Sequence, residues 1–255
     1  MRLLVVGGIH GNEPLGIELV ESLLRWPLPN VDALIANPEA CRKEQRYVDA
    51  DMNRVFPGSP DGDTYESRQA HELRDRLTAG YDLVIDFHNT HAPGNDCGFL
   101  GDRGNRRLAA EAARFLGLSR AVIARYDCIN RYLPNCLSVE ISLDSPECRV
   151  DIWRSRLEAL ARARRGNLTG LTLPLLYRFV QRVTTEQVEG ISLSQGWEAF
   201  RIVPREDAQA LGLEPGSRAI FVEDSYTPWN FAAVVEQVGL LAQKPPSARS
   251  ITGMA

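Results

Sequence analysis

The stretch DLVIDFHNT, residues 82–90, indicates the fold class of this chain, because an apolar run ends abruptly in polar side chains. Such a run is typical of a strand that is buried on both faces of a parallel sheet. The carboxyl ends of parallel strands are where α/β folds gather their binding and reactive groups. We therefore expect His88, at the end of this strand, to belong to a functional site. Asp86 points to the same face of the strand and is a candidate partner for the imidazole, although a purely structural role is equally compatible with the pattern.

The amino-terminus repeats this arrangement. An apolar run at residues 3–6 ends in Gly7-Gly8 and is followed by HGNE at residues 10–13. A histidine three residues before a glutamate, in a tight turn at a helix start, can converge with it on one cation. Two imidazoles and one carboxylate form the ligand set of a catalytic zinc. His10, Glu13 and His88 are therefore predicted to bind one zinc per chain, whereas His10 and Glu13 alone could equally be a loop histidine and a helix-start acid.

Strand-like and helix-like segments alternate over the first two thirds of the chain. Strands are predicted at residues 3–6, 31–36, 82–87, 121–124 and 137–141, and helices at 14–26, 65–77, 106–116 and 152–164. This alternation predicts an α/β fold with a mainly parallel sheet flanked by helices. The polar segment at residues 39–63 is predicted to be a long functional loop.

The pattern changes after residue 166. Short β-like runs at 173–183, 200–203 and 218–222 are separated by prolines and glycines. We predict a catalytic domain at residues 1–166, a small β-rich C-terminal domain at 167–243 and a flexible tail at 244–255.

Composition narrows the class of partner and the compartment. Of 255 residues, 44% are hydrophobic and 24% are charged, which excludes a disordered or fibrous chain. A net charge of −4 without a basic run argues against nucleic acid or membrane partners. Neither a secretory leader nor a membrane span is apparent, and the five cysteines form no C-x-x-C pair. These features favour a cytoplasmic protein with reduced thiols; its oligomeric state is left open, a homo-oligomer included.

Three further residues could carry chemistry beside a metal. Arg46 and Arg54 lie in the long polar loop, where guanidinium groups can grip carboxylates or oxyanions, or form local ion pairs. Glu140 lies inside the apolar strand LSVEI, and a buried carboxylate with a raised pKa is suited to general base and general acid catalysis. The alternative for Glu140 is a strand-edge side chain that faces solvent.

These motifs together resemble a known family. HGNE at 10–13, the segment from Asn37-Pro38 to Arg54, DFHNT at 86–90 and Val139-Glu140 are similar to the aspartoacylase/succinylglutamate desuccinylase family of the zinc carboxypeptidase superfamily. The resemblance covers residues 1 to about 165 and, more weakly, the β-rich region that follows. HNT at residues 88–90 is closer to the aspartoacylase branch. A zinc-carboxypeptidase-like mixed, mainly parallel sheet is the fold that it implies.

The resemblance also implies roles for individual residues. Glu140 would take a proton from water and deliver it to the leaving amine, and Arg46 would stabilise the carbonyl oxyanion. Asn53 and Arg54 would hold the α-carboxylate of the amino-acid half of the substrate.

Two further residues are predicted to bind substrate, and one family residue is displaced. Asn89 is expected to contact substrate beside the metal, and Tyr226 is the best match to a substrate-binding tyrosine of the family's C-terminal region. The arginine that the family carries about ten residues before the catalytic glutamate matches Asn130, with Arg131 next to it. The pocket for the substrate side chain can therefore differ from that of the family.

The predicted function is a zinc-dependent amidohydrolase, a deacylase for small anionic N-acyl amino acids such as N-acetyl-aspartate. A succinylglutamate desuccinylase, a carboxypeptidase-like peptidase and a zinc-binding module without catalysis are the alternatives. A loop that closes the pocket would favour a small substrate, and an open groove would favour a peptide.

Overall fold

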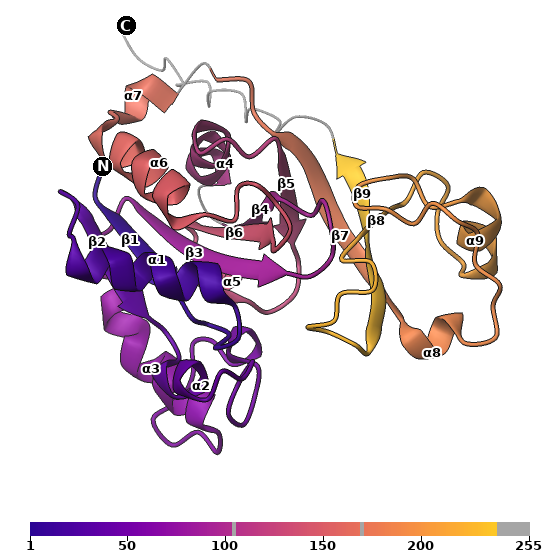
Figure 1. The fold of residues 1–255 in the computed structure, drawn as a ribbon, viewed down its shortest axis with the longest axis horizontal. Helices are drawn as coiled ribbons and strands as arrows, with labels where there is room; N and C mark the ends of the chain where they lie inside the picture. The colour runs from indigo at the N-terminus through magenta and orange to yellow at the C-terminus, as the bar shows by residue number, and fades with distance from the viewer. Residues whose placement is uncertain (104–105, 169–170, 239–255) are drawn as a thin grey trace, which may run out of the picture.

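The computed structural model describes residues 1–103, 106–168 and 171–238, and within them nine strands form one sheet in the order β2-β1-β3-β6-β4-β5-β7-β9-β8 (Figure 1). The strands are β1 (Leu3–Gly7), β2 (Val31–Ile35), β3 (Leu83–Thr90), β4 (Cys97–Gly101), β5 (Arg120–Ala124), β6 (Cys136–Ser142), β7 (Leu175–Thr184), β8 (Arg218–Ile220) and β9 (Asn230–Val238). The β4–β6, β7–β9 and β8–β9 pairs are antiparallel and the other pairs are parallel. The predicted α/β fold with a mixed, mainly parallel sheet is confirmed.

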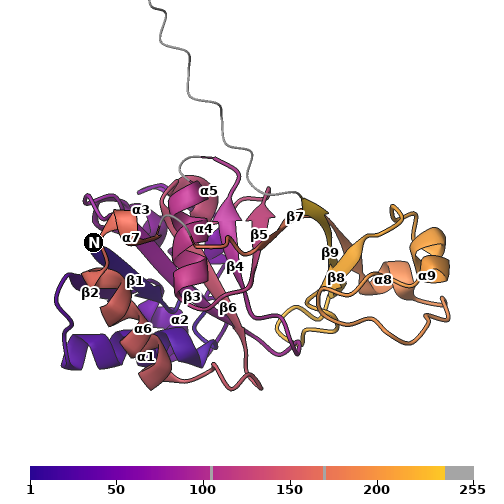
Figure 2. The same ribbon diagram turned by 90° about the horizontal axis from the view of Figure 1, so that it is seen from above.

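Helices cover both faces of the sheet. The helices are α1 (Pro14–Arg25), α2 (Pro38–Arg42), the 3-10 helix η1 (Met52–Arg54), α3 (Tyr65–Leu77), α4 (Arg106–Phe115), α5 (Ile129–Tyr132), α6 (Val150–Arg162), α7 (Arg165–Leu168), α8 (Thr185–Val188) and α9 (Arg205–Ala210). Leu3 and Val5 of β1 pack with α1, α4 and α6, whereas Leu4 and Val6 pack with α3 on the opposite face (Figure 2). Burial of both faces explains why β1 and β3 are continuous apolar runs in the sequence.

The C-terminal strands continue the same sheet. β7 lies parallel to β5, β9 returns antiparallel to β7, and β8 pairs with the outer side of β9. Figures 1 and 2 show these strands at one end of the molecule, with α8 and α9 beyond them. The division into a catalytic and a C-terminal domain stays a prediction, and the segment 239–255, with the expected tail, lies outside the described residues.

Some of the expected elements differ in the structure. No strand forms at residues 200–203, so that prediction is wrong; Ile202 makes only an isolated bridge to Arg218. Phe200, at the start of the predicted strand, and Phe221, directly after β8, have φ angles of 61° and 53°, and this left-handed conformation does not fit an extended strand. The polar segment 39–63 is not a continuous loop, because α2 and η1 form within it. β4 and β9 were not expected.

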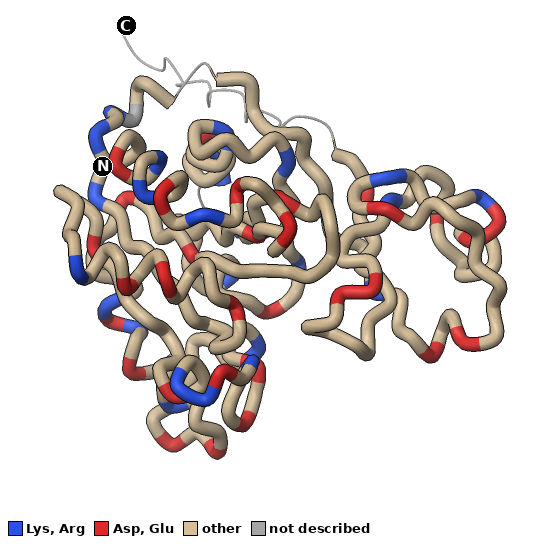
Figure 3. Tube along the Cα trace, in the orientation of Figure 1, with Lys and Arg blue, Asp and Glu red and all other residues tan. Residues whose placement is uncertain are grey.

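Charged residues of both signs are distributed along the described chain, as Figure 3 shows. None of the helices in the described part of the chain is both long and apolar enough to cross a membrane.

Candidate metal centre and active site

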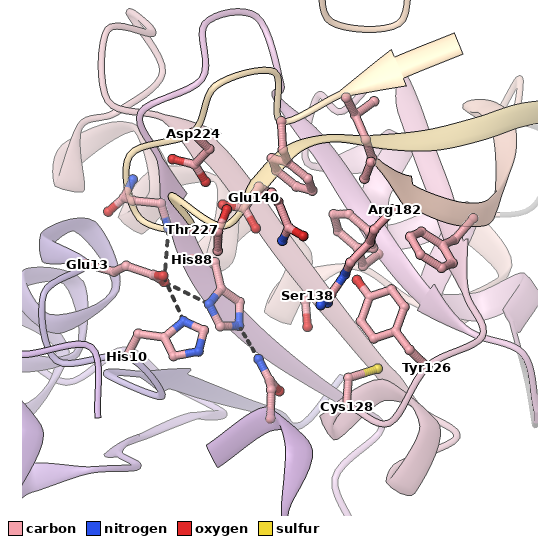
Figure 4. A pocket seen from close by; sticks show the side chains of 18 of the residues that line it. His10, Glu13, His88, Tyr126, Cys128, Ser138, Glu140, Arg182, Asp224 and Thr227 are labelled. Carbon is pink, nitrogen blue, oxygen red and sulfur yellow. Dashed lines mark hydrogen bonds and ion pairs between the residues drawn. The ribbon is translucent and has the colours of Figure 1, made fainter. Parts of the chain in front are cut away.

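His10, Glu13 and His88 converge at the carboxyl ends of β1 and β3. The Nδ1 atom of His10 lies 2.7 Å from Oε1 of Glu13, and the Nδ1 atom of His88 lies 2.7 Å from Oε2 of the same carboxylate (Figure 4). All three side chains are buried, and one ligand atom from each lies within 4.8 Å of the others. The structure thus brings together the three residues that the sequence predicted as metal ligands.

The local backbone aims Glu13 at this site. Glu13 is the residue before α1, and its carboxylate makes no capping hydrogen bond to the helix. Asn89, at the end of β3, takes over that task, since its Oδ1 accepts a hydrogen bond of 2.9 Å from Leu15 N. Gly11 is required for space: a Cβ atom there would lie 2.1 Å from the carbonyl carbon of Ala40. The turn is therefore built so that Glu13 is free to bind a cation.

A second carboxylate faces each imidazole from its other side. The Nε2 atom of His10 lies 3.0 Å from Oδ1 of Asp51, and that of His88 lies 2.7 Å from Oδ2 of Asp86. Carboxylates only accept hydrogen bonds, so each ring must carry hydrogens on both nitrogens unless a cation takes the place of those on Nδ1. Metal-binding histidines characteristically donate their other N–H to a carboxylate. The donor set therefore fits a metal ion.

The ionisable groups of the site shift one another's pKa values. Burial alone would lower the pKa of His88, but Asp86 and Glu13 outweigh it and raise this pKa well above its usual value. Burial opposes charge on Glu13 and Asp51 as well, yet His10 and the other cationic neighbours hold both carboxyl pKa values far below their usual range. Both carboxylates are therefore ionised, as metal ligation and histidine orientation require.

Glu140 faces the metal centre from the adjacent strand. It lies opposite His88 in the β3–β6 register, and both residues line one pocket. Burial raises the pKa of Glu140 well above its usual value; the charges of Glu13 and Asp224 add to this, while His88 and Arg46 oppose it. A solvent-facing strand-edge position does not describe it, since β6 lies between β3 and β4 within the sheet.

The polar loop brings its arginines to the same pocket. Arg46 Nη1 donates to Oε1 of Glu13 at 3.2 Å, and its buried Nε has no hydrogen-bond partner among the described residues. Asn53 Nδ2 lies 3.4 Å from Nε2 of His88. Arg54 lies farther out, donates to the carbonyl of Asp127 at 2.8 Å and lines the pocket.

One carboxylate that sequence analysis missed holds this loop in place. Glu66, fully buried in α3, accepts hydrogen bonds from the backbone N–H groups of Val48 at 2.5 Å, Asp49 at 3.1 Å and Ala50 at 3.0 Å. Asn37 donates to it as well, at 3.1 Å. No sequence signal identifies it, because Glu66 reads as an ordinary acid in the first turn of a helix.

Asn89 and Tyr226 are engaged within the protein. Asn89 lines the pocket, but its Nδ2 donates to the carbonyl of Ile141 at 3.0 Å in addition to the contact with α1. Tyr226 donates its hydroxyl hydrogen to the carbonyl of Asn12 at 2.8 Å and packs against His91. Their predicted substrate contacts stay predictions.

The C-terminal region supplies one wall of the pocket, of which the sequence predicted only a contact from Tyr226. Phe179 and Arg182 of β7, Phe221 and Asp224 after β8, and Thr227 line it together with residues of the metal centre (Figure 4). Arg131 is not among the lining residues; its guanidinium donates to Asp127 at 2.9 Å. Asn130 does line the pocket.

Comparison with known families identifies the class to which this fold and donor set belong. The family described as succinylglutamate desuccinylase/aspartoacylase catalytic domain matches residues 1–124. This segment contains the candidate metal ligands His10, Glu13 and His88 and the polar loop. Residues 1–124 of the chain therefore belong to this family.

Two curated relatives are similar to part of the chain. An N-acyl-aromatic-L-amino acid amidohydrolase (carboxylate-forming) B of Danio rerio is 39% identical over 106 residues, 34% of this chain and 33% of that protein. A probable aspartoacylase of Acaryochloris marina is 36% identical over 105 residues, 36% of this chain and 35% of that protein. The matched part of the chain thus spans about a third of the length of these relatives.

A solved structure shows the same fold over most of the chain. The succinylglutamate desuccinylase of Chromobacterium violaceum superposes with a TM-score of 0.70 at 20% identity, covering 93% of this chain and 85% of that protein. The likeness therefore includes the C-terminal strands.

Proposed function

We propose that this protein is a zinc-dependent amidohydrolase that cleaves N-acyl amino acids to a carboxylate and a free amino acid. The observation that carries the proposal is the position of Glu140, a carboxyl group with a raised pKa, opposite His88 of a buried metal donor set in the same pocket. The names of the matching relatives, an N-acyl-aromatic-L-amino acid amidohydrolase and a probable aspartoacylase, support the same reaction class.

His10, Glu13 and His88 would hold one zinc ion. The chemistry that zinc supplies when bound is a lowered pKa of water and polarisation of a carbonyl group. Asp51 and Asp86 would keep the imidazoles oriented, through the contacts of 3.0 Å and 2.7 Å to their Nε2 atoms.

Glu140 would move the proton that amide hydrolysis requires. It takes a proton from the water whose oxygen attacks the carbonyl carbon, and it delivers that proton to the amine nitrogen as the C–N bond breaks. A raised pKa suits this exchange, because the group must be able to accept and to release a proton near neutral pH. Arg46, with one nitrogen 3.2 Å from Glu13, would stabilise the negative charge that develops on the carbonyl oxygen.

The outer residues of the polar loop would bind the amino-acid half of the substrate. Asn53 and Arg54 both line the pocket, and a guanidinium group binds a carboxylate through two parallel hydrogen bonds. Asn89 and Tyr226 remain candidate substrate contacts, although the hydrogen bonds that they make within the protein would have to change for their side chains to bind substrate.

A small substrate is favoured over a peptide. The segment after β8 contributes Phe221, Asp224 and Thr227 to the pocket lining, and the contact from Tyr226 to Asn12 ties this segment to the metal-binding turn. A pocket wall fixed in this way beside the metal centre suits a small acyl amino acid better than an extended chain. A binding module without catalysis would need neither Glu140 nor Arg46 in this position.

The decisive experiment is a panel of N-acyl amino acids incubated with zinc-loaded protein and scored for release of free amine. We expect release from at least one member with the zinc-loaded protein, and none after removal of zinc by a chelator. Peptides with a free C-terminal carboxylate serve as the comparison set. Release from peptides alone, or release that persists after complete removal of the metal, would contradict the proposal.

A further inference from the structure

Arg182 is placed in the pocket by an irregularity of β7. The pairing of β7 with β9 shifts between Phe179, which lies opposite Val235, and Gln181, which lies opposite Val234. The extra residue is Val180, so the alternation of side chains is interrupted there. Residues three apart in a regular strand point to opposite faces, but here Phe179 and Arg182 line the same pocket. The bulge therefore places the guanidinium group of Arg182 on the same face as Phe179, which is the face of the pocket.

The guanidinium group shares an aromatic ring with a second arginine. Arg182 lies 5.8 Å and Arg54 lies 4.9 Å from the centroid of the Tyr126 ring. The ring also packs edge-on against Phe179, with centroids 5.0 Å apart. Figure 4 shows Arg182 extending from its strand toward Ser138 and Tyr126. Two cationic groups thus meet on one wall of the pocket.

Neither arginine has a carboxylate partner in the described part of the chain. Arg54 donates only to the backbone carbonyls of Asn53 and Asp127, and Arg182 makes no ion pair or hydrogen bond among the described residues. Although Arg182 is exposed in part, desolvation by the pocket wall and the charge of Arg54 lower its pKa, against the opposing effects of Tyr126 and Asp51. By contrast, Arg178 on the same strand is paired with Glu236. The wall therefore has positive charge that an anionic ligand group would neutralise.

The two other residues considered for binding an anion on this wall are Asn130, which is neutral, and Arg131, which does not line the pocket. Asn130 uses its Nδ2 on the carbonyl of Phe99 at 3.0 Å and accepts a hydrogen bond from Ser138. Arg131 is paired with Asp127 and does not line the pocket. Three arginines line the described pocket, and Arg46 and Arg54 are already assigned to the carbonyl oxygen and the α-carboxylate. Arg182 is therefore available for a second anionic group.

We propose that Arg182 is a specificity-determining residue that binds a second carboxylate of the substrate, so that the protein prefers N-acyl amino acids with two carboxylates. The proposal rests on the proposed amidohydrolase function. The second carboxylate can belong to the amino-acid side chain or to the acyl group, since both present the same chemistry to a guanidinium group.

Matched substrate pairs test the proposal on wild-type protein, Arg182→Gln, Arg182→Lys and the control Arg131→Gln. N-acetyl-aspartate against N-acetyl-asparagine reports a carboxylate on the amino acid, and an N-succinyl against an N-butanoyl amino acid reports one on the acyl group. We expect Arg182→Gln to raise the KM for the dicarboxylate of at least one pair by roughly 10–100-fold, the effect of losing a charged hydrogen bond. The KM for its neutral partner should stay within about twofold. Arg182→Lys should recover part of the loss, and Arg131→Gln should behave as wild type.

Equal changes for both members of each pair, or no change in either, would overturn the proposal. So would a wild-type preference for the neutral or aromatic substrates. Calorimetric binding of free aspartate, glutamate and succinate to the zinc-loaded protein is a readout that needs no turnover. Dicarboxylate binding that Arg182→Gln weakens would support the subsite even if no N-acyl amino acid is hydrolysed, an outcome in which only the amidohydrolase function fails. Binding that the variant leaves unchanged contradicts the subsite.

Discussion

The metal end of the pocket and its C-terminal wall are built in different ways. At the metal end, His10, Glu13 and His88 lie near the ends of strands, and each of their ring nitrogens and carboxylate oxygens has a partner within the protein. On the wall, Arg182 reaches the pocket through a strand bulge and has no partner of opposite charge among the described residues. If the proposed function is right, a preorganised network would carry out the reaction, whereas substrate choice would depend on groups still available to bind a ligand.

Loss of a metal ligand should have the largest effect. His88→Ala removes an imidazole held between Glu13 and Asp86 and leaves two ligands, so we expect the protein to lose bound zinc and all measurable hydrolysis. Metal analysis after dialysis checks this, with His71→Ala as the control, since His71 lies in α3 outside the donor set. Full zinc occupancy in a folded His88→Ala protein would exclude this residue as a ligand.

The next largest effect should come from Glu140→Gln. The amide keeps the shape of the side chain but cannot accept the proton, so kcat should fall by roughly 10²–10⁴-fold while zinc stays bound. Steady-state kinetics together with metal analysis measures both quantities on one preparation. Near-normal turnover with zinc retained would assign proton transfer to another group.

Substitutions of the two arginines of the polar loop should change different kinetic parameters. Arg46 contacts Glu13, so Arg46→Ala should lower kcat by roughly 10²–10³-fold, the scale of losing one oxyanion donor. Arg54 lies on the outer wall with Arg182, so Arg54→Ala should mainly raise KM. A pure KM effect for Arg46 and a pure kcat effect for Arg54 would reverse these roles.

The smallest expected effect is a loss of folding stability when Glu66 is replaced. Burial would raise its pKa, but the hydrogen bonds from Val48 and its neighbours outweigh this and lower it from 4.5. The ionised group therefore stabilises the fold above pH 4.5, and the contribution is lost as the pH falls through the lowered value. Glu66→Gln should reduce the free energy of unfolding by roughly 1–3 kcal/mol at pH 7.

Urea unfolding at pH 7 and at successively lower pH values tests this sign. The difference between wild type and Glu66→Gln should shrink as the medium becomes acidic. Glu72→Gln, an exposed change on the same helix, is the matched control and should show no such trend. A difference that is constant with pH would mean that the carboxylate charge does not hold the loop.

Sequence analysis succeeded where the determining contacts are local. The strands that end near His10 and His88 are continuous apolar runs, because both of their faces are buried, and the polar residues that follow mark the sheet edge. It also identified Asp86 as a candidate partner of His88, from the two-residue spacing, and the structure has them 2.7 Å apart.

The features that could not be predicted from the sequence depend on contacts between distant residues or interrupt the regular alternation of a strand. Glu66 holds a loop more than fifteen residues before it, and nothing in its neighbours signals this. β4 is short and contains two glycines, which weakens its strand signal. Alternation in β7 would place Phe179 and Arg182 on opposite faces, and only the pairing with β9 reveals the shift.

The bulge in β7 has a consequence for how such a pocket can change. Deleting Val180 would leave Gln181 and Arg182 opposite Val234 and Ala233, so Arg182 would stay on the same face as Phe179. Inserting one residue in β9 opposite Val180 would instead make the pairing regular and place Phe179 and Arg182, three residues apart, on opposite faces, while every charged residue of the chain is kept. Substrate preference would then be altered by the length of one strand. A specificity that depends on register in this way can be gained or lost in a single one-codon deletion or insertion, without substitution of any residue that contacts the substrate.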